Sequence, residues 1–318
     1  MIKDNNLLEE VILVKPRGFC AGVKRAIEIL ELVLEKYGLP IYVNHQIIHN
    51  THVMEEFTNK GIIFVDDLEQ IPDGSRVVFS AHGSPPGLYE KAKRKRLKIF
   101  DATCPLVTKV HSEAKRYEKE GYYIFYVGHD LHPETMGVLQ EVKPQNIALI
   151  NGLSQAKKIN PPQVKKLVLL NQTTLSLDDF QEITSFLKEK YPNLTLPLGK
   201  DICYATRNRQ TGVKLLAKKV ELILVVGSSF SSNSNRLCEV AQNRGIKAYL
   251  IDDSGKMKNS WLDKVKHLGI TSGASVPEKL VKDLLDRLKK QYPKLKIREK
   301  KYINEDQIKF SLPKELQN

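Results

Sequence analysis

The sequence predicts an α/β fold in which three similar units, with mostly parallel sheets, could converge on a shared centre. Short runs rich in β-branched and aromatic residues alternate with longer stretches that have helical periodicity. Apolar runs of this kind between helices are typical of parallel sheets that are covered on both faces. Three cysteines, 84 and 99 residues apart, also stand where an extended segment changes into a helical one, which indicates a coarse threefold repeat.

The expected strands are short apolar runs, several of which end in a turn or a polar cluster. In chain order they are 11–14, 41–44, 62–65, 76–83, 98–103, 122–129, 147–150, 166–174, 221–228, 247–252 and 267–275. Because most of them are continuously apolar rather than alternating, we expect them to be buried on both faces.

Three helical stretches begin at a cysteine. These are Cys20 in GFCAGVKRAIEIL, Cys104 in ATCPLVTKVHSEAKRY and Cys203 in DICYATRNRQTGVKLLAKK. We therefore expect α/β units at 1–103, 104–200 and 201–318, the last with a C-terminal tail. The fourth cysteine, Cys238, lies among apolar residues of a helical stretch, and we interpret it as ordinary packing.

The composition is that of a cytoplasmic globular protein. Apolar residues make up 41% of the chain, which is enough to build sizeable cores. No stretch approaches the roughly 18 uninterrupted apolar residues that a membrane span needs, and the first ten residues do not resemble a signal peptide. In a reducing compartment, four cysteines suggest metal binding or catalysis rather than a disulfide scaffold.

The net charge of +13 raises the alternative of nucleic-acid binding. Such a function needs basic residues gathered on one face, preferably with aromatic side chains between them for stacking. The densest basic run, KAKRKRLK at 91–98, lies on a helical stretch, and 282–301 forms a diffuse basic tail. We interpret both as solvated faces and expect no nucleic-acid partner.

A cysteine at the start of a helix is well placed for metal binding or nucleophilic chemistry. The first N–H groups of the helix have no internal partner, and their field favours the thiolate. Three such thiolates would leave one coordination position open at a metal site. Zinc with three cysteines and a histidine is one possibility, although the close cysteine pairs of structural zinc sites are absent. An iron–sulfur cubane with one open iron is another.

Polar side chains follow several strands, at the edge where ligands gather in parallel sheets. They are His45, His49, His82, His129, His132, Glu134, Thr173 and Thr174. The stretch VVGSSFSSNSNRL at 225–237 adds a glycine turn with hydroxyl and amide groups, and TSGAS at 271–275 is similar. These groups could hold phosphate oxygens, or they could serve only as helix caps and turns.

Nine stretches, in this order, closely resemble the 4-hydroxy-3-methylbut-2-enyl diphosphate reductase family. They are RGFCAGVKRA, IIHN, SAHG, FDATCPLVTKVH, HPE, QTTLS, DICYATRNRQ, VVGSSFSSNSNRL and GAS. The resemblance covers nearly the whole chain, and DATCPLVTKVH and SSNSNRL are highly specific. HPETMG and AHGSPPG depart slightly from the family's pattern without changing an expected ligand.

The resemblance implies a trefoil arrangement around a 4Fe-4S cluster held by Cys20, Cys104 and Cys203. It implies reduction of the allylic diphosphate to isopentenyl and dimethylallyl diphosphate, the last step of the methylerythritol phosphate route to isoprenoids. It further implies a monomer or weak dimer that receives electrons from ferredoxin or flavodoxin.

The matching motifs also imply roles for single residues. The expected diphosphate ligands are His49, His82, Ser231, Ser232, Asn233 and Ser275, and His132 is expected to bind the substrate beside them. Three residues are expected to be catalytic. Glu134 would donate a proton, and His132 would belong to the polar network of the diphosphate ligands. Thr173 would also bind the substrate by orienting its hydroxyl. Burial should raise the pKa of Glu134 and keep it protonated near neutral pH.

From the residues alone, one further class of enzyme stays open. A zinc or thiol hydrolase acting on a phosphorylated substrate would use a metal-bound water or a Cys–His pair. Iron and sulfide analysis separates this alternative from the reductase, because only the reductase requires both elements.

Overall fold

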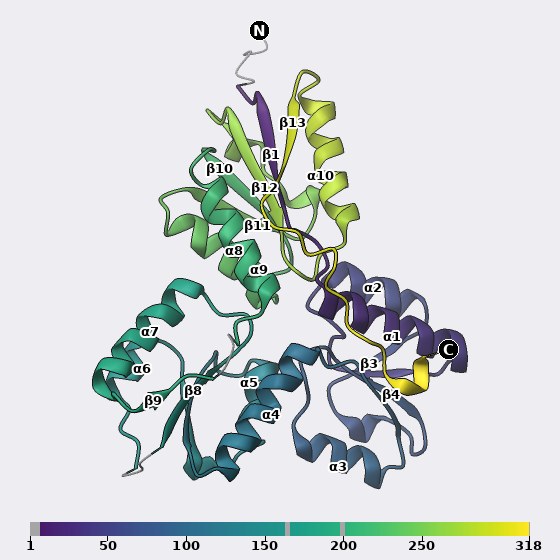
Figure 1. The fold of residues 1–318 in the computed structure, drawn as a ribbon. Helices are drawn as coiled ribbons and strands as arrows, with labels where there is room; N and C mark the ends of the chain where they lie inside the picture. Colours follow the sequence, from purple (N-terminus) through teal and green to yellow (C-terminus); the bar gives the residue numbers. More distant parts are fainter. Residues whose placement is uncertain (1–6, 163–165, 198–200, 318) are drawn as a thin grey trace. The chain divides into compact units, whose positions relative to one another are not determined.

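The strands form three separate sheets (Figure 1). This computed structural model describes residues 7–162, 166–197 and 201–317. Every paired set of strands in the described residues is parallel. The predicted α/β class with three parallel-sheet units is therefore confirmed, and each expected run contains a strand.

The chain divides into two compact units. Compact unit 1 consists of the described residues of Met1–Cys20, His49–Val53 and Tyr204–Lys309, and compact unit 2 of those of Ala21–Ile48, Met54–Cys203 and Phe310–Asn318. Compact unit 1 holds one sheet, and the first strand of the chain belongs to it because this strand pairs with two strands from the C-terminal third. The three boundaries expected from the sequence stay a prediction.

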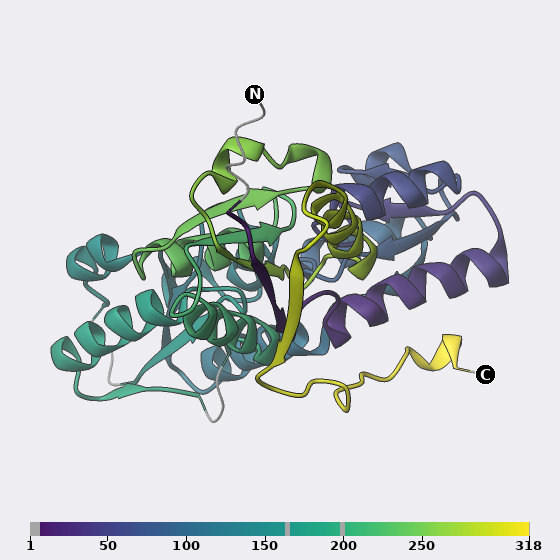
Figure 2. The same cartoon turned by 90° about the horizontal axis from the view of Figure 1, so that it is seen from above.

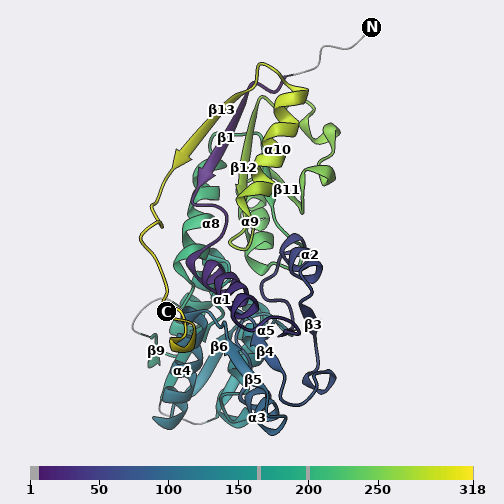
Figure 3. The ribbon, with the colours of Figure 1, turned by 90° about the vertical axis from the view of Figure 1, so that its right-hand side faces the viewer.

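The sheet of compact unit 1 has the order β11-β10-β12-β1-β13. Its strands are β1 (Glu10–Lys15), β10 (Leu222–Val226), β11 (Lys247–Ile251), β12 (His267–Ser272) and β13 (Lys296–Lys301), and its helices are α8 (Tyr204–Leu216), α9 (Ser232–Gln242) and α10 (Glu278–Gln291). Along β1, Ile12 and Val14 pack in the cluster of α8 and α9, whereas Val11 and Leu13 pack in the cluster of α10. Figure 3 shows α8 and α10 on opposite sides of these strands, so both faces are buried as predicted.

The expectation of a diffuse basic tail at 282–301 was wrong. The first part of it belongs to α10, whose buried Leu284 and Leu288 face the core. The last part is β13, KIREKK, which pairs with β1 from Glu10↔Lys296 to Lys15↔Lys301. An edge strand of this kind has one free side and needs few apolar residues, and its charges discourage pairing with further strands. The basic composition therefore concealed a strand.

Compact unit 2 contains two four-stranded sheets, with the orders β3-β2-β4-β5 and β7-β6-β8-β9. The strands of the first are β2 (Tyr42–Asn44), β3 (Ile63–Val65), β4 (Arg76–Phe79) and β5 (Lys98–Asp101). Those of the second are β6 (Tyr123–Val127), β7 (Ile147–Ile150), β8 (Leu167–Asn171) and β9 (Leu194–Thr195). The short β9 pairs with β8 through Leu167↔Leu194 and Val168↔Thr195 at the edge of the second sheet.

The helices between the first and third cysteines cover these two sheets. They are α1 (Ala21–Tyr37), α2 (Thr51–Asn59), α3 (Pro86–Arg94), α4 (Pro105–Lys119), α5 (Pro133–Leu139), α6 (Leu153–Lys158) and α7 (Leu177–Lys190). The second sheet is buried on both sides, because Phe125 packs in the cluster of α6 and α7 whereas Tyr126 packs in the cluster of α4 and α5. None of the helices within the described residues has the length and apolar character to cross a lipid bilayer.

The end of the chain lies along α1 (Figure 2). Lys36 Nζ donates a hydrogen bond of 3.0 Å to the carbonyl of Glu315, and Arg25 Nε donates one of 2.7 Å to the carbonyl of Ser311. Leu316 is buried. The expected C-terminal tail is thus anchored within compact unit 2.

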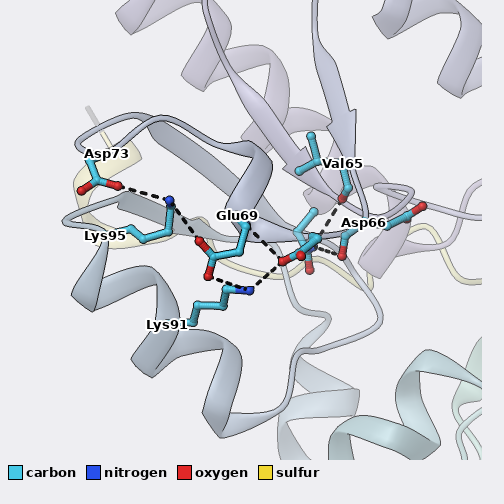
Figure 4. Close-up of polar contacts among 8 residues, drawn as sticks. Val65, Asp66, Glu69, Asp73, Lys91 and Lys95 are labelled. Carbon is cyan, nitrogen blue, oxygen red and sulfur yellow. Dashed lines mark hydrogen bonds and ion pairs between the residues drawn. The ribbon is translucent and has the colours of Figure 1, made fainter.

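The basic run on α3 is paired with acidic side chains (Figure 4). Lys91 Nζ lies 2.6 Å from Asp67 Oδ1 and 3.0 Å from Glu69 Oε1. Lys95 Nζ lies 3.5 Å from Glu69 Oε2 and 3.2 Å from Asp73 Oδ1. These acids offset part of the positive charge of the helix, so α3 is less basic than its own sequence indicates.

Candidate active site

The three cysteines stand directly before helices, as the sequence predicts. The helices α1, α4 and α8 begin at Ala21, Pro105 and Tyr204, one residue after each cysteine. All four cysteines of the chain are outside disulfides, and these three are partly exposed whereas Cys238 is buried. Burial raises the pKa of Cys238 to about 12, which fits its predicted role in packing.

Backbone hydrogen bonds attach each of these cysteines to the loop at the end of a strand. The N–H of Cys20 donates to Ala274 O in compact unit 1 (3.0 Å). In compact unit 2, the N–H of Cys104 donates to Ala81 O (3.0 Å) and that of Cys203 to Thr173 O (3.1 Å). Within the described part of the chain, no three His, Cys, Asp or Glu side chains form a group that could hold one metal ion.

In compact unit 2, Glu134 and Thr173 are the central pair among the predicted polar residues that follow the strands. The backbone N–H of Thr173 donates to Glu134 Oε1 (2.6 Å), and Thr173 Oγ1 lies 3.0 Å from Glu134 Oε2. Both residues are buried, with exposed fractions of 2% and 4%. Glu134 lies in the first turn of α5 and Thr173 follows β8, so two segments distant in sequence fix both carboxyl oxygens.

His132 lies beside this pair, and His82 lies next to His132. His132 is the N-cap of α5, and its Nδ1 accepts the backbone N–H of Glu134 (3.2 Å). An Nδ1 that accepts must carry no hydrogen, so the neutral ring has its proton on Nε2. The ring centroids of His132 and His82 are 6.5 Å apart. The Oγ of Ser80 lies 3.2 Å from His82 Nδ1 and helps to orient that ring.

Gln172 is a buried connector that the sequence analysis did not single out. Its Oε1 accepts the backbone N–H of His129 (2.9 Å), and the hydroxyl of Thr135 donates to it at 3.4 Å. Its Nε2 donates to Thr174 Oγ1 (2.8 Å). One side chain thus joins the loop after β6, helix α5 and the end of β8. Its position in NQTT, between an apolar strand and two threonines, was the available signal.

The loop that carries His82 also approaches α4 closely. Gly83 has a φ of +81°, which favours glycine. A Cβ at this position would lie 2.9 Å from His111 Nε2 and 3.0 Å from Val107 Cγ1. A larger residue would therefore push the loop, and His82 with it, away from α4.

Compact unit 1 contains the second predicted group, the residues expected to hold a diphosphate. Ser231 is the N-cap of α9, since its Oγ accepts the backbone N–H of Ser234 (3.3 Å), while Ser232 opens the helix. Asn233 is 4% exposed, and neither atom of its side-chain amide has a hydrogen-bond partner in the described structure. Since buried polar groups are nearly always paired, this amide needs a polar partner, which an ordered water or a polar ligand can supply.

Hydrogen bonds hold the strand ends of compact unit 1 together. Ser275 Oγ donates to the carbonyl of His49 (2.9 Å), which joins two more of the predicted residues. The N–H of Gly18 donates to Ser272 Oγ (2.8 Å), and the fully buried Arg209 donates through Nη2 to the carbonyl of Gly18 (2.7 Å). The loop before the first cysteine is therefore fixed to the end of β12 and to α8.

A family model described as LytB protein matches residues 11–289. The chain belongs to the LytB family. It is 46% identical over 309 residues to a 4-hydroxy-3-methylbut-2-enyl diphosphate reductase of Polaromonas sp. (strain JS666 / ATCC BAA-500), covering 97% of this chain and 92% of the relative. A protein of the same name from Nocardia farcinica (strain IFM 10152) is also 46% identical, over 98% of this chain and 93% of the relative.

The fold of a LytB protein is also found among solved structures. The E-1-hydroxy-2-methyl-but-2-enyl-4-diphosphate reductase of Plasmodium falciparum matches with a TM-score of 0.94 and 38% sequence identity, over 97% of each chain. Like these relatives, this LytB family member is an enzyme of the oxidoreductase class.

Glu134 is the acid of the predicted catalytic group, and its pKa is raised. Burial raises its pKa to about 7, although the hydrogen bonds from Thr173 lower it, and the charge of Asp201 adds a small increase. The carboxyl group is thus partly protonated at neutral pH in this LytB protein, in the direction that the sequence predicts.

We expect Glu134→Gln to remove a pH-dependent loss of stability. The folded chain keeps the Glu134 proton up to about pH 7, whereas the ordinary pKa is 4.5. The folded state therefore binds more protons between these values, and the free energy of unfolding falls as pH rises. The fall is about 3 kcal/mol for a shift of this size. Urea unfolding of the apoprotein at pH 5 and pH 8 measures this fall. The free energy of unfolding of the variant minus that of the native chain should be about 3 kcal/mol larger at pH 8 than at pH 5. An equal difference at both pH values contradicts the shift.

Proposed function

We propose that this chain reduces 4-hydroxy-3-methylbut-2-enyl diphosphate to isopentenyl and dimethylallyl diphosphate, as the last step of the methylerythritol phosphate route. The observation that carries the proposal is the buried Glu134–Thr173 pair. A hydroxyl is a poor leaving group unless it is protonated, and this pair supplies an acid whose pKa of about 7 suits proton transfer at neutral pH.

The cysteines fit a 4Fe-4S cluster with one open iron. Cys20, Cys104 and Cys203 are thiols outside disulfides, and each precedes a helix whose first N–H groups favour a thiolate. Three thiolate donors match a cubane that keeps one position for the substrate. When bound, such a cluster supplies electrons and a Lewis-acidic iron.

The remaining predicted residues suit a diphosphate. Ser231 Oγ accepts hydrogen bonds from the backbone N–H and the hydroxyl of Ser234, so its own hydrogen can be donated to a ligand. The amide of Asn233 can donate as well. His132 carries its proton on Nε2, which makes it a further donor. The full proposed set of substrate-binding residues, in which Thr173 orients the substrate hydroxyl, is His49, His82, His132, Thr173, Ser231, Ser232, Asn233 and Ser275.

The geometry gives a short route for the proton. When Glu134 is neutral, its Oε2–H can donate to Thr173 Oγ1 at 3.0 Å, and the Thr173 hydroxyl can donate its own hydrogen to the hydroxyl of the substrate. That hydroxyl then leaves as water. The overall reaction consumes two electrons and two protons, of which one leaves in the water and the other is added to carbon.

The electrons must come from a separate donor, for which we propose a ferredoxin or flavodoxin. The net charge of +13 favours association with an acidic carrier of this kind.

Anaerobic preparation followed by metal and turnover assays tests the proposed function. We expect iron and acid-labile sulfide near four per chain, and formation of both products when a reductant and the allylic diphosphate are supplied. Zinc without sulfide would instead favour a hydrolase. An iron–sulfur protein that leaves the diphosphate substrate unchanged would contradict the proposed reaction.

A further inference from the structure

An ion pair within compact unit 2 joins the segments that carry two of the cysteines. Lys109 lies on α4, which begins directly after Cys104, and Asp201 lies two residues before Cys203. Lys109 Nζ is 2.7 Å from Asp201 Oδ1 and 3.1 Å from Glu113 Oε2. Lys109 thus bridges its own helix and the segment leading to the third cysteine.

Because Asp201 is buried, the segment that carries it has few positions in which its carboxyl group is paired with a cation. The side chain of Asp201 is 0% exposed, compared with 34% for Lys109 and 12% for Glu113. Glu113 lies beside Asp201 as well as beside Lys109, so Lys109 is the cation that two neighbouring carboxyl groups share. A buried carboxylate is costly without a cation beside it. The segment from Asp201 to Cys203 is therefore most stable in the position in which Asp201 contacts Lys109.

Backbone hydrogen bonds attach the two cysteines to different sheets. The N–H of Cys104 is bonded to the loop after β4, and the N–H of Cys203 to the loop after β8. These bonds place each cysteine against its own sheet. The Lys109–Asp201 contact instead connects the two cysteine-bearing segments directly.

We propose that Lys109 is a positioning residue whose pairing with Asp201 sets the separation of Cys104 and Cys203. The proposal rests on the proposed function in one respect, that the two thiols serve a common group. The separation itself is a property of the chain without that group, so it can be measured in the apoprotein.

Cross-linking of the full-length apoprotein tests this role. In a Cys20→Ala, Cys238→Ala background, Cys104 and Cys203 are the remaining thiols, and dibromobimane becomes fluorescent when it bridges both. Bridging depends on the effective concentration of one thiol at the other, so we expect Lys109→Met to lower the bridging rate by about tenfold. Lys109→Arg keeps the charge and should recover most of the rate.

A matched control lies on the same helix. Lys115 contacts Glu141 at 3.3 Å, and its side chain is 57% exposed. Lys115→Met removes the same charge from α4 without touching the Asp201 segment, so it should leave the bridging rate unchanged.

A second variant keeps the test decisive if Lys109→Met fails to fold. That substitution leaves a buried carboxylate without its cation, whereas the double variant Lys109→Met, Asp201→Asn removes both charges. The double variant should fold and still bridge slowly. Bridging at the parental rate in either folded variant overturns the proposal, as does a parent that does not bridge. If the bridging results are as expected but the native chain binds no iron, the positioning role stands and the proposed cluster falls.

Discussion

Glu134→Gln is expected to lower kcat by about 10²- to 10⁴-fold, the usual contribution of a positioned general acid. Glutamine keeps the shape of the side chain, and its carbonyl can still accept the N–H of Thr173. It has no proton to transfer, so protonation of the leaving hydroxyl fails while binding persists. Iron and sulfide content and the Kd for the diphosphate substrate should stay near native values. Near-normal turnover would remove Glu134 from its proposed role.

The pH dependence of turnover distinguishes the loss of the Glu134 proton from a general distortion of the site. Because the pKa of Glu134 is raised to about 7, native turnover should decline as pH rises above this value and the group loses its proton. The residual turnover of Glu134→Gln should lack that decline. Glu141, another largely buried carboxylate in compact unit 2, contacts His111 and Lys115 instead of Thr173. Glu141→Gln is the matched control, and it should retain both the rate and the decline.

The predictable part of this site comes from short-range rules. A cysteine at the start of a helix and a polar residue after an apolar strand can both be recognised in a few residues. Since the carboxyl ends of parallel strands meet at one edge, Glu134 after β6 and Thr173 after β8 were expected to lie together. The structure places them in hydrogen-bond contact.

The parts that the sequence did not predict depend on packing between distant segments. The Lys109–Asp201 pair forms because α4 and the segment before the third cysteine meet, which no local pattern encodes. Gln172 connects His129 and Thr135, from two other segments, with Thr174 in its own segment. The strand β13 has the composition of a basic tail, because its position at the sheet edge removes the need for apolar residues.

Cys104→Ser is expected to abolish the intact cluster without unfolding the protein. Cys104 is the N-cap of α4, and serine is among the preferred residues at this position, so the helix should persist. A serine hydroxyl does not supply the thiolate that iron–sulfur clusters require. After anaerobic reconstitution, iron and sulfide should fall close to background while the circular dichroism spectrum stays native. A full iron content would exclude Cys104 as a ligand.

The matched control, Cys238→Ser, should show the opposite pair of effects. Cys238 is buried within α9, and burial raises its pKa to about 12, so its thiol does not supply a thiolate. Serine at this position buries a hydroxyl in an apolar cluster and should cost about 1–3 kcal/mol of stability. Iron and sulfide should nevertheless remain at the native level. Since one substitution removes the cluster from a stable chain and the other keeps it in a weakened chain, the comparison separates a ligand from a packing residue by two independent measurements.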